Sequence, residues 1–409
     1  MAGAGSASFS PTPVVEVLSV APAGGWVWFV DPRAIHYSGK AYYSYIQGTN
    51  GNIASRTVDD DTLTVSAAQT AYPNFDVDDH DDASLLVRAS DNFICMAFAQ
   101  HVGDLYFAAG ASAGLLPNSI LQVANITSQV GGPTGFPDVP GYTYANLCQF
   151  SALADTLYIF YRHHDSGGTA RLGWTRSTNN GSTWSSGVDP ITVTYSKGAV
   201  NGSDRIDFAV GEGPNIDPTA SLYHCYYVPS TDKWYRTNGT EITATRPFGV
   251  SELTLVYNGS PLPSWVWDIA IESATGYPII VFAFFHSTTD HRYGYARWNG
   301  STWTAYEIAT GGSYLYAAQP YYSGGVSLDH TQPTVVYCSR QVSGQFQIFK
   351  MTTADYGVTW SSTQITDDAN NNVRPVVIRD HHSSMKVLWL TGTYTSYTSY
   401  SEGTSGSSY

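Results

Sequence analysis

The segments Ser177–Trp184, STNNGSTW, and Thr353–Trp360, TADYGVTW, share the pattern Ser/Thr-x-Asp/Asn-x-Gly-x-Thr-Trp. In a hairpin, the Asp or Asn at the third position can cap the backbone amides of the turn, and the glycine supplies its special dihedral. The closing tryptophan then packs between neighbouring sheets. WNGSTW at Trp298–Trp303 is a degenerate third copy. The repeat indicates a fold assembled from similar small sheets.

The rest of the chain predicts short strands separated by turns. Segments such as AYYSYIQG, LYIFYR and YPIIVFAFF are apolar and aromatic and are bounded by turn residues. Only 13% of the 409 residues are charged while 14% are aromatic, which favours strands over helices. No stretch has a sustained helical period. We therefore expect an all-β protein, and at this length either two domains or one closed repeat architecture.

Regularly spaced short strands are typical of a sandwich or a propeller. Hairpins with the pattern Ser/Thr-x-Asp/Asn-x-Gly-x-Thr-Trp, called Asp boxes, resemble those of sialidase-type β-propellers. This resemblance favours the propeller. We predict a single β-propeller over residues 1–400 with four-stranded antiparallel blades. Seven blades of about 58 residues would be somewhat longer than the usual blade of about 40–50, and six blades are the alternative. The last segment, SEGTSGSSY at 401–409, is expected to be a flexible tail.

Charge and apolar content restrict the partners. The net charge of -14 argues against nucleic acid, and it disfavours a polyanion unless a local basic cleft overrides it. No apolar run is long enough to span a bilayer, so we expect no membrane insertion. The N-terminal segment has no basic region and Glu16 interrupts its apolar run, so we do not expect a signal peptide. An extracellular protein whose signal was removed, or a virion-associated one with other virion proteins as partners, fits these features.

Cysteines and histidines supply few metal sites. Cys95, Cys148, Cys225 and Cys338 are far apart in apolar stretches, which predicts buried free thiols. The candidate zinc ligands are His224, Cys225, Cys338, His381 and His382. Adjacent residues of a strand face opposite sides, so His224 and Cys225 cannot easily share one ion. The candidate calcium ligands are Asp76, Asp78, Asp79 and Asp82, without the regular EF-hand spacing. We expect no required cofactor, with structural zinc or calcium as less favoured alternatives.

The stretch DVDDHDDASLLVRASDNFICMAFAQH at 76–101 is the main candidate site. Four aspartates surround His80, and His101 follows after a strand-like segment. The cluster can bind a metal, hold a catalytic base, or form a solvated acidic turn. Carboxylates raise the pKa of a histidine, so His80 suits a charge neutraliser or proton donor. His101, flanked by uncharged residues, is the better neutral base.

Several longer stretches resemble the BNR-repeat propeller family that includes the ulvan lyases. They include WFVDPRAIHYSGKAYYSYIQGTNGNI, DDHDDASLLV, WVWDIAIESATGYPIIVF and YYSGGVSLDHTQPTVVYCSRQVSGQFQI, in family order over most of the chain. The resemblance implies a lyase that cleaves an acidic, uronate-containing polysaccharide by β-elimination. Its two histidines, tyrosine and arginine correspond to His80, His101, Tyr144 in YTYANL and Arg162 in YIFYR.

Further substrate contacts are expected around these four. The resemblance places a second tyrosine at Tyr195 in TVTYSKG, and His163 and His164 follow directly after Arg162. Arg88 and Arg205 are candidate helpers for a local positive patch. We expect the catalytic residues side by side on one face, toward the propeller axis, while Trp184 and Trp360 lie on the outer rim.

Two other functions compete with the lyase. The family also contains proteins of phage particles, and the many Tyr and Trp side chains suit stacking on sugars. A non-catalytic glycan-binding propeller, such as a phage tail or virion receptor-binding protein that recognises a cell-surface glycan, is therefore the alternative. A sialidase-type glycoside hydrolase is less favoured, because DPRAIH places Arg33 in a comparable strand but the Arg-Ile-Pro motif is absent.

Overall fold

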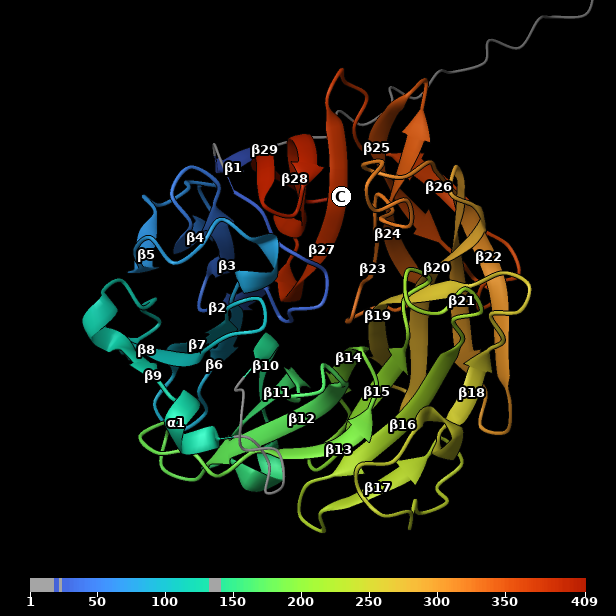
Figure 1. The fold of residues 1–409 in the computed structure, drawn as a ribbon. Helices are drawn as coiled ribbons and strands as arrows, with labels where there is room; N and C mark the ends of the chain where they lie inside the picture. The colour runs from blue at the N-terminus through green and yellow to red at the C-terminus, as the bar shows by residue number, and fades with distance from the viewer. Residues whose placement is uncertain (1–17, 22–23, 132–140) are drawn as a thin grey trace, which may run out of the picture.

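In the computed structural model, which describes residues 18–21, 24–131 and 141–409, antiparallel sheets are arranged around a central axis (Figure 1). The segment 1–17, which carries most of the signal-peptide prediction, lies outside the described residues. In the described residues the helices are all short. They are α1 (Thr127–Val130) and the 3-10 helices η1 (Asp79–Asp81), η2 (Ile120–Gln122), η3 (Ser151–Leu153) and η4 (Val250–Glu252). No helix of the described ranges is long and apolar enough to cross a membrane.

The largest sheet joins the two ends of the chain. Its strands, in spatial order, are β1 (Leu18–Ala21), β29 (Ser399–Ser407), β28 (Met385–Ser396), β27 (Asn371–His382), β2 (Ala34–Tyr37), β3 (Lys40–Gln47), β4 (Asn52–Asp59) and β5 (Gln69–Tyr72). Every pair is antiparallel except β2 with β27, which meet in parallel at Ile35 and Arg379. Two antiparallel four-stranded halves are thus connected edge to edge.

Five further sheets complete the ring. Two of them contain β6 (Ser84–Val87), β7 (Phe93–Ala99), β8 (Leu105–Ala113) and β9 (Val123–Asn125), then β10 (Tyr142–Gln149), β11 (Leu157–His164), β12 (Ala170–Ser177) and β13 (Val188–Thr192). The next contains β14 (Tyr195–Val200), β15 (Ile206–Gly211), β16 (Leu222–Val228) and β17 (Lys233–Arg236), with β18 (Thr254–Tyr257) also paired to β16. The last two contain β19 (Ser264–Glu272), β20 (Tyr277–Ser287), β21 (Asp290–Trp298) and β22 (Trp303–Gly312), then β23 (Val326–Leu328), β24 (Val335–Val342), β25 (Gln345–Thr352) and β26 (Ser361–Gln364).

The prediction of a flexible C-terminal tail is wrong. Residues 399–407 form β29, which pairs with β28 on one side and with N-terminal β1 on the other, Leu18 opposite Gly406. The small polar side chains of this segment are largely buried, and Glu402 is only 1% exposed. Strand pairing on both edges, which composition does not reveal, orders the segment and closes the ring.

The Asp-box hairpins have the predicted structure. Gly181 N donates to Ser177 Oγ at 2.9 Å and Thr183 N donates to Asn179 Oδ1 at 2.9 Å. The second copy repeats the network, with Gly357 N to Thr353 Oγ1 at 2.8 Å and Thr359 N to Asp355 Oδ1 at 2.9 Å. Both glycines have positive φ, 88° and 100°.

The tryptophan of each box packs against the third strand of the preceding sheet. Trp184 contacts Phe107 of β8, with ring centroids 5.2 Å apart, and Trp360 contacts Tyr295 of β21 at 5.3 Å. In the degenerate copy, Trp303 contacts His224 of β16 at 5.3 Å. The boxes therefore connect neighbouring sheets, as predicted, and contain none of the candidate site residues.

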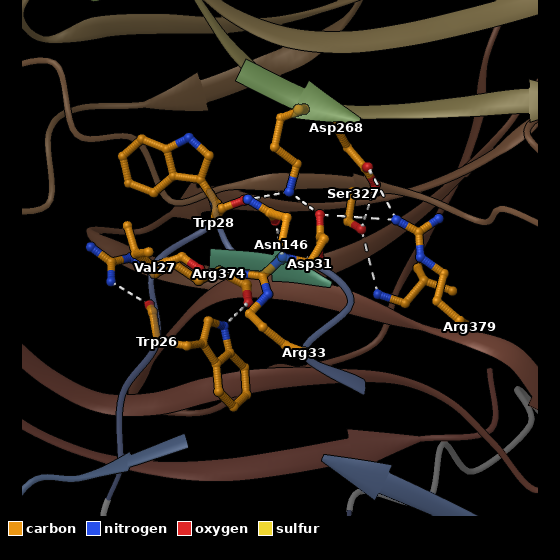
Figure 2. A network of polar contacts seen from close by, with 12 residues as sticks. Trp26, Val27, Trp28, Asp31, Arg33, Asn146, Asp268, Ser327, Arg374 and Arg379 are labelled. Atoms are coloured by element: carbon orange, nitrogen blue, oxygen red, sulfur yellow. Dashed lines mark hydrogen bonds and ion pairs between the residues drawn. The ribbon is translucent and has the colours of Figure 1, made fainter. Parts of the chain in front are cut away.

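A stretch of non-strand chain occupies the centre of the ring. Residues Trp26–Asp31, here called the axial segment, have side chains that are at most 9% exposed. Trp26 Nε1 donates to the carbonyl of Arg374 and Trp28 Nε1 donates to that of Val266, both at 3.1 Å. Figure 2 shows this segment among residues from strands on several sides of the ring. The axis is consequently filled with protein rather than open.

The four cysteines are free, as predicted, with Cys95, Cys225 and Cys338 buried and Cys148 partly buried.

Candidate functional site

The acidic segment around His80 is buried. Asp78 caps the 3-10 helix η1, because its carboxylate accepts from His80 N at 3.0 Å. Asp79 and Asp81 inside η1 are fully buried, and His80 is 4% exposed. Of the alternatives drawn from the sequence, the solvated acidic turn is therefore wrong. Burying this many carboxyl groups requires partners or protonation, and both are present here.

Asp78 joins the two histidines. Its Oδ1 lies 2.6 Å from His80 Nδ1 and its Oδ2 lies 3.1 Å from His101 Nδ1. The imidazole rings stack with centroids 4.0 Å apart and an interplanar angle of 5°. When Nδ1 of each ring donates to Asp78, Nε2 of a neutral imidazole carries the lone pair. A neutral imidazole at either position therefore carries its proton on Nδ1, and its basic atom, Nε2, is directed away from the Asp78 carboxylate.

The two histidines have opposite pKa shifts. Burial disfavours the charged form of His80, but the hydrogen bonds that its ring donates to Asp78 and Asp79 outweigh burial and raise its pKa. Burial lowers the pKa of His101, and the positive charges of His80 and Arg162 add to this, against the hydrogen bond that its ring donates to Asp78. His80 therefore holds its proton more readily than His101, in the order that the sequence indicated.

A β-bulge places Tyr144 beside the histidines. The register of β10 against β11 shifts between Thr143 and Asn146, and Tyr144 has a φ of +57°. Left-handed backbone is rare for an aromatic residue, and bulges of this kind redirect side chains near functional sites. The Tyr144 ring lies 5.6 Å from that of His80. Burial raises the pKa of its phenol well above the ordinary value, so the hydroxyl keeps its proton.

Arg162 covers Tyr144 from the neighbouring strand. Arg162 pairs with Thr143 across β11 and β10. Its guanidinium carbon lies 4.4 Å from the centroid of the Tyr144 ring and 5.7 Å from the centroid of the Tyr195 ring. Among the described residues no carboxylate lies within 4.0 Å of Arg162, although the side chain is 7% exposed. A buried guanidinium without a protein anion is suited to receive one from a ligand.

Residues of the largest sheet hold the histidine pair in place through Asp79. Asp79 Oδ2 accepts a hydrogen bond from Tyr394 at 2.6 Å and an ion pair from the fully buried Arg374. Asp79 Oδ1 lies 3.1 Å from His80 Nδ1. Arg374, like Tyr144, lies at a bulge and has a positive φ of 52°. This ion pair fixes η1 against β27.

Tyr397 is a neighbour that the sequence did not reveal. It lies in the turn between β28 and β29, and its ring is edge-on to His80 at 5.2 Å and to His101 at 5.9 Å. Its carbonyl accepts from Asp79 N at 2.9 Å. The contact depends on ring closure more than 300 residues along the chain, so no local motif marks it.

The model of a family described as "BNR repeat-containing family member" matches residues 40–310. The chain belongs to the BNR repeat-containing family. None of the curated proteins in the comparison matches it.

Two solved structures show the fold of this BNR chain. An ulvan lyase of polysaccharide lyase family PL25, bound to -[GlcA(1-4)Rha3S]-, superposes with a TM-score of 0.73 at 15% identity, covering 95% of this chain and 94% of that one. The polysaccharide lyase Uly1 superposes with a TM-score of 0.62 at 11% identity, covering 95% and 90%. At these identities the similarity establishes a β-propeller of the same architecture.

The remaining predicted contact residues of the BNR chain divide into two groups. Tyr195 and His164 are near the four central residues: Tyr195 stacks under Arg162, and Arg162 and His101 help burial to lower the pKa of His164 to about 4. His163, Arg88 and Arg205 are elsewhere.

These three are structural residues, so their prediction as substrate contacts is wrong. His163 is fully buried against Asp189 at 2.7 Å. Arg88 binds Asp91 and the carbonyl of Asn180 in the first Asp box. Arg205 forms a bidentate pair with its near neighbour Asp207. Alternation along a strand turns His163 away from the face that Arg162 presents.

Metal ligation was also predicted at other positions. His224 lies 3.0 Å from Asp207 and 2.8 Å from Thr237 Oγ1, while Cys225 faces a separate apolar cluster. Within the described residues the one metal-like grouping is Asp78, His80 and His101, whose ligand atoms lie within 4.8 Å of one another. It combines one carboxylate with two imidazoles, a set that suits a transition metal better than calcium.

Proposed function

We propose that this BNR propeller is a lyase that cleaves an acidic, uronate-containing polysaccharide by β-elimination. The observation that carries the proposal is the pair of histidines with opposite pKa shifts on one carboxylate, beside a protonated tyrosine and an arginine without a protein anion. Groups with divergent pKa values in one site are the usual arrangement for acid and base catalysis. The resemblance to the ulvan lyases implies the same four residues, which are His80, His101, Tyr144 and Arg162.

Each residue has a role that the geometry supports. Arg162 binds the uronate carboxylate and neutralises it, which acidifies the proton on the adjacent C5. Neutral His101 removes that proton through Nε2, and the C5–H electrons form the C4–C5 double bond as the C4–O bond breaks. The phenol of Tyr144 gives its proton to the departing oxygen. Protonated His80 holds Asp78 in place and adds positive charge.

The acidic balance of the chain is compatible with such a substrate. Arg162 and protonated His80 make a positive region next to Tyr144, and the carboxylates nearby are either paired, as Asp79 is with Arg374, or have raised pKa values, as Asp81 and Asp82 do. A charge-assisted Arg–carboxylate contact contributes about 1.5–3 kcal/mol, which offsets a diffuse repulsion that salt screens. The GlcA of the ligand bound to the ulvan lyase neighbour carries such a carboxylate, so ulvan is the first substrate to test.

We further propose seven blades. The eight-stranded sheet counts as two, because its halves share only the pair Ile35 and Arg379, and the other five sheets each form one. An extracellular or virion-associated location, with a polysaccharide or cell-surface glycan as partner, is part of the same proposal.

The experiment is incubation with ulvan and a panel of other uronate glycans, monitored by the ultraviolet absorbance of the unsaturated uronate product. The wild type is expected to produce it, and His101→Ala and Arg162→Gln are expected not to. Binding to glycans without product from any of them, in long incubations, would replace the lyase by a glycan-binding propeller.

A further inference from the structure

A cavity of about 330 Å³ lies between the inner strands at the end of the ring away from His80. Strands β10 and β14 both run from the histidine site to the cavity. Tyr144 and Tyr195, near the first residues of these strands, face the histidine site, whereas the last residues, Gln149 and Val200, line the cavity. The lining begins at Asn146 and Ser196, just after the two tyrosines, and at about 3.3 Å per residue it extends along β10 to Gln149, roughly 16 Å from Tyr144.

The axial segment separates the cavity from the histidine site. Asp31, its last residue, lines the cavity floor, and its N–H donates to Asn146 Oδ1 at 2.6 Å. The preceding residues Val27–Val30 are at most 1% exposed and fill the axis behind it. A molecule in the cavity is therefore not a continuation of a glycan bound beside Arg162.

The cavity wall is apolar. Leu147, Phe160, Ala199, Ile206, Phe208 and Ile271 come from β10, β11, β14, β15 and β19. The cavity volume is at the lower end of the range of about 300–1,000 Å³ that is usual for small-molecule sites. Such walls suit a hydrocarbon ring or short chain better than the hydroxyl-covered surface of a sugar.

Arg379 supplies the polar end. It lies late in β27, lines the cavity and is 20% exposed. Its nearest carboxylate oxygens are Asp31 Oδ2 at 3.9 Å and Asp268 Oδ1 at 4.0 Å, too far for hydrogen bonds. Within the described residues its guanidinium donates no hydrogen bond to protein, and the dashed lines that join it to both aspartates in Figure 2 are these two long ion pairs. A guanidinium has five donors, and a mostly buried one requires acceptors.

Both aspartates are already engaged by other groups. Asp31 forms ion pairs with Lys197 and with Arg33, the latter at 3.4 Å. Asp268 accepts from Leu328 N at 2.9 Å and Ser327 Oγ at 3.1 Å, and lies 3.1 Å from His330 Nε2. Neither carboxylate can turn to Arg379 without giving up these contacts. The donors of Arg379 thus remain available to a ligand.

We propose that this cavity binds a small organic carboxylate with an apolar body, its carboxylate on Arg379 and its ring or chain against Phe160 and Phe208. Bidentate binding of a carboxylate is the geometry that a guanidinium provides. His330 and the exposed Asp380 also line the cavity.

The test is isothermal titration calorimetry on the full chain with benzoate, and with benzyl alcohol as its uncharged analogue. Benzoate is expected to bind at millimolar or lower concentration, and benzyl alcohol at least tenfold more weakly. Arg379→Gln is expected to weaken benzoate binding at least tenfold. Ala199→Leu, which fills the cavity and leaves Arg379 in place, is expected to abolish it. His101→Ala, a variant of the other site, is expected to leave it unchanged.

Each contrary result overturns the proposal. No benzoate binding to the folded wild type removes the site, and equal binding of the two probes removes the carboxylate. Binding unaffected by both Arg379→Gln and Ala199→Leu places the ligand elsewhere. Near-ultraviolet circular dichroism shows whether each variant is folded, and Ala199→Leu keeps the test decisive if Arg379→Gln does not fold. The outcome is independent of lyase activity.

Discussion

His80 and His101 stack at 4.0 Å on the two oxygens of one carboxylate, and their pKa values move in opposite directions. Burial lowers the pKa of both rings, so the difference arises from the number of carboxylates that each ring contacts and from the positive charges beside His101. His80 contacts Asp78 and Asp79, whereas His101 contacts Asp78 alone and lies next to positive charges. One buried acidic turn thus holds two imidazoles in the same place, of which His80 keeps its proton to a higher pH than His101.

Removing the neutral imidazole should abolish most of the activity. His101→Ala is expected to lower kcat by roughly 100- to 10,000-fold, which is the usual contribution of a general base. His382→Ala is the matched control, because His382 is exposed and, among the described residues, its ring forms hydrogen bonds with Ser384 alone, away from His101. Initial rates of product absorbance measure both. Equal rates for the two variants would assign the base to another residue.

Arg162 should be sensitive even to a conservative change. Arg162→Lys keeps the charge but loses the planar fork and the stacking on Tyr144, so kcat/KM is expected to fall roughly 10- to 100-fold. Arg205→Lys is the control, since that arginine is paired with Asp207 away from the site. A full rate in Arg162→Lys would show that the uronate carboxylate is neutralised by some other group.

The pH profile should report the state of His101. A base must be deprotonated, and the pKa of His101 lies below its ordinary value of 6.5, so kcat/KM is expected to decline only below pH 6.5. In Asp78→Asn the hydrogen bond that raises this pKa loses its negative charge. The acidic limb should then move to still lower pH, while kcat falls because the rings lose their fixed tautomer. A limb that moves to higher pH in the variant would contradict this arrangement.

Local sequence predicted what depends on local contacts. The Asp boxes were recognised because Thr353, Asp355 and Gly357 make their hydrogen bonds within one turn. His80 and His101 were found through the acidic run, and Tyr144 and Arg162 through the family resemblance. Tyr397 and Arg374 were missed because ring closure brings them to η1 from the far end of the chain. The sequence alone does not show burial, so the buried acidic turn around His80 could be interpreted as a solvated one.

The Asp-box hydroxyls should contribute measurably to stability. Thr353→Val removes the acceptor of Gly357 N and the donor to Asp355, and is expected to cost about 1–3 kcal/mol of unfolding free energy. Ser203→Ala is the control, because Ser203 is exposed and its hydroxyl makes no hydrogen bond to described residues. Denaturant unfolding followed by tryptophan fluorescence measures the difference. An equal midpoint for both variants would mean that the turn forms without this bond.

Asp81 should make the stability of the protein depend on pH in the unusual direction for a carboxylic acid. Burial, with the charges of Asp78 and Asp76, raises its pKa from 3.8 to about 10. The folded state therefore holds a proton that the unfolded state releases above about pH 4. The contribution of Asp81 to stability is complete below pH 3.8 and declines as the pH rises toward the folded pKa of about 10.

Asp81→Asn mimics the protonated acid at every pH. It is expected to raise the Tm at pH 8 by several degrees and to change it little at pH 4, as measured by calorimetry in matched buffers. Asp61→Asn, in an exposed turn, is the control that reports net charge alone. A variant that stabilises equally at both pH values, or destabilises at pH 8, would show that Asp81 is ionised in the folded protein.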